Sequence, residues 1–219
     1  MNIIDFSLQH SVINTYMSEL RDSNYQKSPL LFRNNIRRIG QFIAYEISKQ
    51  LDYHDINVVT PLGNAAIAVP TDKIVVATVL RAGLPMHDGI LSVFDKAENA
   101  FASAYRTYED DAHTQVGIHV EYLAAPSLDG KTLIIADPML ATGGSMELAY
   151  KALLSHGTPK HIHIASVIAA TEGINHIRNT VPNDKTTVWC GAIDPCLNAQ
   201  KYIVPGLGDA GDLCFGEKL

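Results

Sequence analysis

One stretch of the chain, residues 133–145 (LIIADPMLATGGS), runs from an apolar segment through an acidic residue and a small-residue turn to a helix start. Residues 133–135 form the continuous apolar run that a parallel strand covered on both faces requires. Gly143 and Gly144 carry no Cβ, so the backbone can turn there and come close to a ligand. Asp137, at the carboxyl end of the strand, can accept hydrogen bonds from sugar hydroxyls. This order is typical of a site for a phosphorylated sugar.

A helix is expected directly after this turn. Residues 146–154 have apolar side chains at helical spacing, Ser145 can cap their first turn, and His156-Gly157 is a stop signal. The free N–H groups of the first turn and the positive end of the helix dipole favour an anion in the loop. A strand-turn-helix connection without a ligand is the alternative for a Gly-Gly turn alone. The acid, Thr142, the glycines and Ser145 together favour a ligand.

Two arginines follow other strand-like segments. Arg81 belongs to the motif at residues 79–86 (VLRAGLPM) and stands at the end of an expected strand. There its guanidinium could bind a phosphate through two hydrogen bonds, which Lys would do less well. The alternative is an arginine that only hydrogen-bonds neighbouring carbonyls. Arg106 follows the strand-like residues 100–105 and is a candidate for a second clamp. The acidic polar residues 107–113 that come next predict a mobile loop and favour a plain surface ion pair for Arg106.

A glycine-rich loop lies near the carboxyl terminus, at residues 202–212 (YIVPGLGDAGD). Its glycines match the G-x-G-x-x-G dinucleotide pattern, but that fingerprint needs a following helix, a second strand and an acid about 20 residues on. Only eight residues follow Gly211, so the match is spurious. The loop instead suits a small planar ligand that meets backbone donors and acceptors, with Ile203 and Leu207 as apolar sides. A structural turn is the alternative.

The histidines are interpreted without a metal. His161 and His163 share a strand face, but they alternate with core isoleucines and have no evident third ligand. His54 and His87 are interpreted as surface residues. Asp194 follows an apolar segment and could face the same crevice as the motifs above.

The composition limits the functions that this chain can have. The sequence has 219 residues, 47% of them hydrophobic, which is enough for one domain spanning residues 1–219. A net charge of -6 argues against a nucleic-acid partner. No apolar run is long enough for a membrane span, and the start lacks the features of a signal peptide. Three cysteines without paired spacing suit reduced thiols, so we expect a cytoplasmic protein.

Strands and helices alternate along the chain, which predicts an α/β fold with a parallel sheet. We expect strands at residues 74–80, 133–136 and 162–169, helices at 31–51, 84–96, 145–154 and 172–179, and a hairpin apart from the sheet at 58–69. Ligands bind at the carboxyl ends of the strands in such sheets, so the motifs that follow strands should converge on one crevice.

Together these motifs resemble those of the uracil phosphoribosyltransferases in order and spacing. The similarity rests on residues 80–84, 105–106, 137–145 and 202–212. Phosphoribosyltransferases for other bases usually carry two adjacent acids where this sequence has Asp137-Pro138. The resemblance implies a phosphoribosyltransferase type I-like parallel sheet flanked by helices, with a small hood and arm built from the N- and C-terminal segments and a hairpin. Residues 107–126 and 212–219 depart from the family pattern.

The resemblance also implies an activity: transfer of the 5-phosphoribosyl group from phosphoribosyl diphosphate (PRPP) to uracil, giving UMP and diphosphate, with Mg²⁺ carried mainly by PRPP. The implied PRPP-binding residues are Arg81, Arg106, Asp137, Pro138, Met139, Leu140, Ala141, Thr142, Gly143, Gly144, Ser145 and Asp209. The implied uracil-binding residues are Ile203, Gly208, Asp209 and Ala210. No single general base and no direct metal ligand is identified.

Two other functions stay open from the sequence. One is transfer to another base, and the other is a non-catalytic regulator that binds PRPP or nucleotides and contacts RNA, against which the acidic balance speaks. As partners, the resemblance implies the small molecules PRPP and uracil, with neither nucleic acid nor membrane. It further implies a homo-oligomer, a dimer or larger, with GTP as a candidate effector.

Overall fold

The computed structural model describes residues 1–108 and 116–217, and within these ranges no side chain between residues 104 and 121. Its main sheet is built from β1 (Asn2–Asp5), β4 (Ile74–Val79), β5 (Glu98–Tyr108), β6 (Val116–Ala124), β7 (Thr132–Ala136), β8 (Met139–Leu140), β9 (His161–Ala170) and β10 (Thr186–Asp194). The strand order is β1-β10-β9-β7-β4-β5-β6, and β8 pairs with β9. Only the β5–β6 pair is antiparallel among these described strands. The predicted parallel α/β sheet is confirmed.

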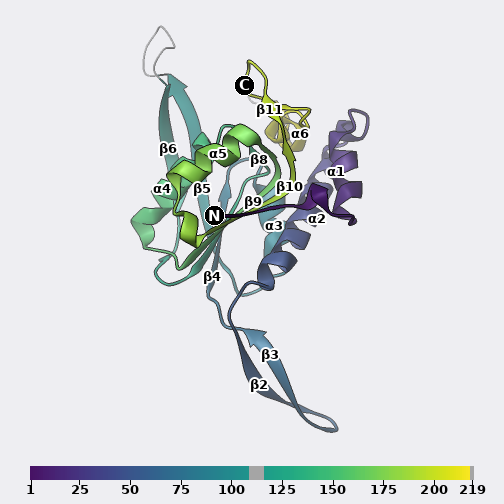
Figure 1. Cartoon of the computed structure of the whole chain (residues 1–219), viewed down its shortest axis with the longest axis vertical. Helices are drawn as coiled ribbons and strands as arrows, with labels where there is room; N and C mark the ends of the chain where they lie inside the picture. Colours follow the sequence, from purple (N-terminus) through teal and green to yellow (C-terminus); the bar gives the residue numbers. More distant parts are fainter. Residues whose placement is uncertain (109–115, 218–219) are drawn as a thin grey trace.

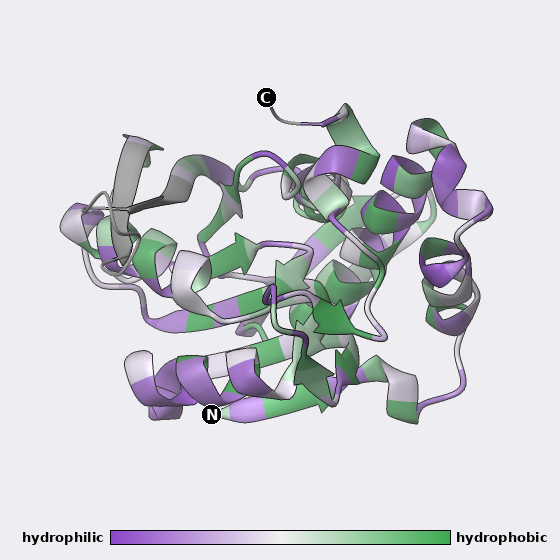
Figure 2. Cartoon of the chain, turned by 90° about the horizontal axis from the view of Figure 1, so that it is seen from above, coloured by the Kyte–Doolittle hydropathy of each residue, from purple (hydrophilic) through white to green (hydrophobic). Residues whose placement is uncertain are grey.

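Helices cover both faces of this sheet. They are α1 (Ile13–Arg21), α2 (Pro29–Ser48), α3 (Leu84–Leu91), α4 (Gly144–Leu153), α5 (Thr171–Thr180) and α6 (Ala210–Phe215). The buried side chains of α1, α2, α3 and α6 pack with Val76 and Ile134 on one face, and those of α4 and α5 pack with Val75 and Ile135 on the other. Burial on both faces explains the continuous apolar runs of β4 and β7. Figure 2 shows mostly hydrophobic strands in the middle of the molecule, with helices that carry hydrophilic segments around them.

The helix boundaries differ slightly from the predicted ones. α2 begins at Pro29, because Ser28 caps the helix by accepting a hydrogen bond from the Leu31 N–H and proline suits the first helical position. α3 ends at Leu91, well before residue 96, in a turn where the Phe94 N–H still donates to the Ile90 carbonyl at 3.2 Å. Apolar spacing alone did not mark that turn.

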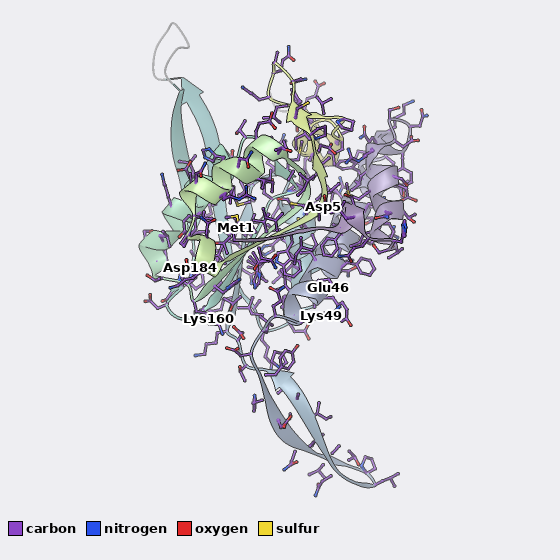
Figure 3. The ribbon with its side chains drawn as sticks, in the orientation of Figure 1. Met1, Asp5, Glu46, Lys49, Lys160 and Asp184 are labelled. Carbon is purple, nitrogen blue, oxygen red and sulfur yellow. The ribbon has the colours of Figure 1, made fainter. Side chains whose placement is uncertain are left out.

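The predicted hairpin is confirmed and longer than expected. It consists of β2 (Tyr53–Thr60) and β3 (Gly63–Pro70), which form a separate two-stranded sheet. This hairpin projects from one end of the molecule as an arm (Figure 1). Lys160, just before β9, and the Glu46–Lys49 ion pair, at 2.6 Å, lie toward the same end (Figure 3).

The carboxyl-terminal segment packs against α2 toward the opposite end, where it forms the hood. There β11 (Cys196–Leu197) pairs with β12 (Ile203–Val204), and α6 packs against α2. Arg33 of α2 donates a hydrogen bond to the Cys214 carbonyl at 2.5 Å. The carboxyl-terminal segment thus lies at the end of the molecule opposite the hairpin (Figure 1). No helix within the described residues is long and apolar enough to cross a membrane.

Candidate active site

The loops that carry Arg81 and Asp137 leave neighbouring strands at the same level. Thr78 of β4 pairs with Ala136 of β7, so both loops start side by side at the carboxyl edge of the sheet. From β4 the chain continues to β5 on one side, while β7 lies on the other. Such a switch in strand order opens a crevice for ligands in parallel sheets. The predicted convergence of the two motifs is therefore present in the fold.

Asp137 is half-buried where β7 enters the 137–145 loop. Its Oδ1 accepts a hydrogen bond from the Met139 N–H at 3.1 Å. Burial raises the pKa of this carboxyl group to about 7, and the single backbone hydrogen bond opposes that rise only in part. Among the described residues, no basic side chain forms an ion pair with Asp137. The carboxylate is thus ready for hydroxyl donors or for a bound cation.

The 137–145 loop is clamped to the sheet at its start. The Pro138 carbonyl accepts hydrogen bonds from Val167 at 3.1 Å and from Ile168 at 2.9 Å, and β8, which contains Met139 and Leu140, pairs with β9. Since β9 is a central strand, the loop backbone is held by a rigid element. Rigid support of this kind keeps binding groups in place.

Gly143, and not Ser145, is the N-cap of α4. The helix begins at Gly144, Gly143 has φ +83°, and no side chain caps it, so the expectation that Ser145 caps the helix is wrong. A Cβ on Gly143 would also lie 2.8 Å from the His176 ring. Glycine therefore supplies a left-handed turn with no room beside it. Ser145 lies in the first turn, where its hydroxyl joins the free N–H groups as possible anion partners.

A cavity of about 300 Å³ opens over this loop. It is lined by Asp137, Met139, Leu140, Ala141, Thr142, Gly143, Ser145, Met146, Gln200, Lys201 and Tyr202. Sequence analysis missed Gln200 and Lys201 as lining residues. Lys201 has φ +67°, the only positive value among the described non-glycine residues, and nothing in the residue type signals this. The positive charge of Lys201 on the lining of this cavity suits an anionic ligand.

Arg81 reaches from the first loop toward the carboxyl-terminal segment. Its guanidinium donates to Asp212 Oδ1 at 3.2 Å and to the Gly216 carbonyl at 3.3 Å, and the Leu80–Arg81 peptide is cis. Gly83 follows in the same turn, where a Cβ would lie 2.1 Å from Thr78 Oγ1. The turn therefore packs directly on the end of β4, and it leaves the Arg81 head group partly exposed beside α6.

The base loop, defined here as residues 203–210, touches the 137–145 loop. The Ala210 N–H lies 3.4 Å from Met139 Sδ. Ile203 and Ala210 are buried, and Gly208 has φ +86°. Asp209 is the N-cap of α6, and its Oδ1 accepts a hydrogen bond from the Asp212 N–H at 3.0 Å. Three of the four sequence motifs therefore lie together at the carboxyl edge of the sheet, where the base loop contacts Met139 and Arg81 contacts Asp212.

The remaining predicted residues are placed differently. Arg106 lies in β5, but its side chain is outside the described residues, as are residues 109–115 of the predicted mobile loop. Thr107 and Tyr108 belong to β5. Asp194 is buried beneath the base loop, where it pairs with Arg21, and does not line the cavity described above.

Both histidines of β9, His161 and His163, make contacts to β10. Trp189 Nε1 donates to His163 Nδ1 at 3.0 Å, and His161 Nε2 lies 3.1 Å from Thr187 Oγ1. Burial lowers the pKa of His163 to about 3. No group of three or more potential metal-binding side chains occurs among the described residues. In contrast to the surface interpretation, His87 is buried in α3, where its Nε2 lies 2.7 Å from Asn99 Oδ1.

Another cavity, of about 770 Å³, lies at the root of the hairpin. Its lining includes Pro70, Ile74, Phe94 and Lys131, and none of the candidate site residues singled out from the sequence. Ile74 begins β4 and Lys131 precedes β7, so this cavity lies at the amino ends of these strands. The chemistry-bearing motifs therefore point to the smaller cavity at the carboxyl edge.

Comparisons with known proteins agree with this placement. The family model for uracil phosphoribosyltransferase matches residues 7–217. A uracil phosphoribosyltransferase of Porphyromonas gingivalis is 55% identical over 219 residues, covering 100% of both chains. One from Methanothermobacter thermautotrophicus is 38% identical and covers 86% of this chain and 85% of its own. The AQ2163 protein of Aquifex aeolicus superposes with a TM-score of 0.85 at 31% identity over 98% of each chain. The chain therefore belongs to the uracil phosphoribosyltransferase family.

Proposed function

We propose that this chain transfers the 5-phosphoribosyl group of PRPP to N1 of uracil, giving UMP and diphosphate. The contact between Ala210 and Met139 is the observation that carries the proposal, because it brings the base loop against the loop suited to a sugar phosphate. Family membership identifies the base as uracil. Residues 1–219 would act as one domain.

In this proposal the 137–145 loop binds the sugar phosphate. Backbone N–H groups of the 140–145 turn, with the hydroxyls of Thr142 and Ser145, would hold the 5-phosphate at the start of α4. The Met139 N–H donates to Asp137 instead, so Met139 would shape the loop. Pro138, Leu140, Ala141, Gly143 and Gly144 shape the loop between them. Asp137 would accept hydrogen bonds from the ribose hydroxyls as a carboxylate. The hydrogen bonds between the Pro138 carbonyl and β9 would keep the phosphate-binding turn and the Asp137 carboxylate at a fixed distance from each other.

Arg81 would contact the diphosphate, together with Arg106. When the diphosphate leaves, positive charge develops on the ribose ring, and the reaction depends on holding both partners in place. Mg²⁺ would arrive on PRPP and neutralise part of the diphosphate charge. The Asp137 carboxylate, which forms no ion pair with a basic side chain among the described residues, could contact this cation.

Uracil would be read by the base loop. Backbone groups of Ile203, Gly208 and Ala210 would meet its donor and acceptor edge, and Asp209 would lie between uracil and the diphosphate. A base with a different pattern, such as cytosine, would leave buried polar groups unpaired. We include a homo-oligomer and a GTP effector in the proposal on the basis of the family resemblance.

Initial rates of nucleotide formation from PRPP and Mg²⁺ test the proposal, with uracil, cytosine, hypoxanthine and adenine as competing bases. UMP should form with uracil at a kcat/KM at least about 10⁴ times that for cytosine, because a site that pairs its polar groups with one base rejects bases that leave them unpaired. Preference for a purine, or no turnover with any base at saturating Mg²⁺, would contradict the proposal.

A further inference from the structure

One pair of side chains holds the base loop at a single residue. Asp194, at the end of β10, accepts a hydrogen bond from the Gly206 N–H through its Oδ2 at 2.8 Å. Arg21, at the end of α1, donates through Nη1 to the Gly206 carbonyl at 3.0 Å. Both backbone groups of Gly206 are thus fixed by residues that lie 185 and 12 positions away in the sequence.

The pair itself is rigid. Arg21 Nη1 donates to Asp194 Oδ2 at 2.9 Å, and Nη2 donates to Oδ1 at 2.8 Å, which is the two-pronged geometry that fixes orientation as well as distance. The Asp194 side chain is only 7% exposed. Burial alone would raise the pKa of Asp194, but the Arg21 guanidinium and the Gly206 N–H outweigh it and lower the pKa. The pair is therefore ionised at neutral pH.

The loop cannot relax easily around this anchor. Gly206 has φ +63°, and a Cβ there would lie 2.1 Å from the Ile203 carbonyl, so the turn is already closed on itself. Gln26 adds a second anchor, because its Nε2 donates to the Leu207 carbonyl at 2.7 Å and to the Leu20 carbonyl at 2.6 Å. The amino-terminal segment thereby holds two consecutive residues of the base loop.

We propose that Arg21 and Asp194 are positioning residues for base recognition, which set the backbone groups of the base loop where the edge of uracil meets them. This inference rests on the proposed function. A base read by backbone groups meets no side chain that could rotate to follow it, so binding depends on where the loop backbone lies. The sugar phosphate would be held separately, by a loop clamped to β9 through Pro138. Loss of the pair should therefore weaken uracil binding more than PRPP binding.

Asp194→Asn and Arg21→Lys test the inference. Asp194→Asn keeps the size of the side chain but places an amide against the guanidinium or the Gly206 N–H, and Arg21→Lys keeps the charge but loses the fork. We expect the KM for uracil to rise by about 10- to 100-fold in Asp194→Asn and by less in Arg21→Lys, with the KM for PRPP changed by less than about twofold. Arg37→Gln is the matched control, because it removes the exposed Arg37–Asp88 ion pair and leaves the base loop alone.

The two KM values separate positioning from general damage. A parallel rise of both KM values with a lower melting temperature, or an unchanged KM for uracil in folded Asp194→Asn, would overturn the inference. If Asp194→Asn does not fold, Arg21→Lys is judged by the same criteria. Absence of uracil turnover in the wild-type protein would instead remove the proposed function, so the two failures can be told apart.

Discussion

At the scale of single residues, Asp137 is an acid whose burial is only partly offset by hydrogen bonding. Burial raises the pKa of its carboxyl group, and among the described residues only one hydrogen bond, from the Met139 N–H, favours the charged form. The residue type and its place after a strand predicted a ligand-facing acid. The raised pKa was not predictable, because it depends on how far the folded chain buries the carboxyl group.

The pKa of about 7 predicts a pH dependence. If the carboxylate binds ribose hydroxyls, kcat/KM for PRPP should fall as the pH drops below about 7. Asp137→Asn should lower kcat/KM at pH 8 by about 100-fold or more and should lack this acidic limb. Initial rates from pH 5.5 to 9 would measure both. An identical acidic limb in the variant would assign the titration to the substrate and contradict the role of Asp137.

Stability provides the control for that experiment. A carboxyl group whose folded pKa lies above its unfolded value of 3.8 stabilises the folded state most below that unfolded value, and this contribution is lost as the pH rises through about 7. Asp137→Asn should therefore unfold at the same or a higher temperature than the wild type at pH 8. A lower melting temperature in the variant would mean that its activity loss reflects misfolding.

At the scale of elements, the order of strands and helices followed from the sequence, but their closest contacts did not. Alternating apolar runs and helical periodicity predicted β4, β7, β9, α2, α4 and α5. The pairing of Arg21 with Asp194 was missed, because the residues near each of them in the sequence give no sign of a contact with a partner 173 positions away. Sequence spacing reports periodicity within an element, whereas such contacts depend on how elements pack.

The contact of α5 with the 137–145 loop leads to an element-scale prediction. A Cβ on Gly173 would lie 2.4 Å from the Leu140 carbonyl and 2.6 Å from the Ala141 carbonyl. Glycine to alanine inside a helix normally stabilises it by about 0.5–1 kcal/mol. Here Gly173→Ala should instead destabilise the protein by about 1–3 kcal/mol. It should also raise the KM for PRPP about tenfold or more, because the loop must shift.

Asn179→Ala is the control on the same helix, since Asn179 is exposed. Chemical denaturation and PRPP titration of the three proteins would give both quantities. A stabilised Gly173→Ala variant with the wild-type KM for PRPP would show that α5 does not fix the loop.

At the scale of the whole molecule, the hairpin stands apart from the core. Val59 is 83% exposed and Leu62 is 100% exposed. An isolated two-stranded hairpin is marginally stable in water at best. The homo-oligomer that we expect from the family resemblance would cover these apolar side chains with a second copy of the chain.

Charge on the hairpin should therefore change the assembly. The double variant Val59→Lys/Leu62→Lys should sediment as a smaller species than the wild type, because lysine is costly to bury in an apolar interface. His54→Lys/Asn57→Lys adds the same number of lysines at exposed polar positions of the same hairpin and should sediment like the wild type. Equal sedimentation of all three proteins would exclude the hairpin from any interface.

The arrangement of the crevice can be tested directly by a crystal structure of the protein with UMP. We expect the 5-phosphate at the N–H groups of the 140–145 turn, the ribose hydroxyls at Asp137, and the uracil ring against the backbone of residues 203–210. The nucleotide in the cavity at the root of the hairpin, or a uracil ring turned away from the base loop, would contradict the account.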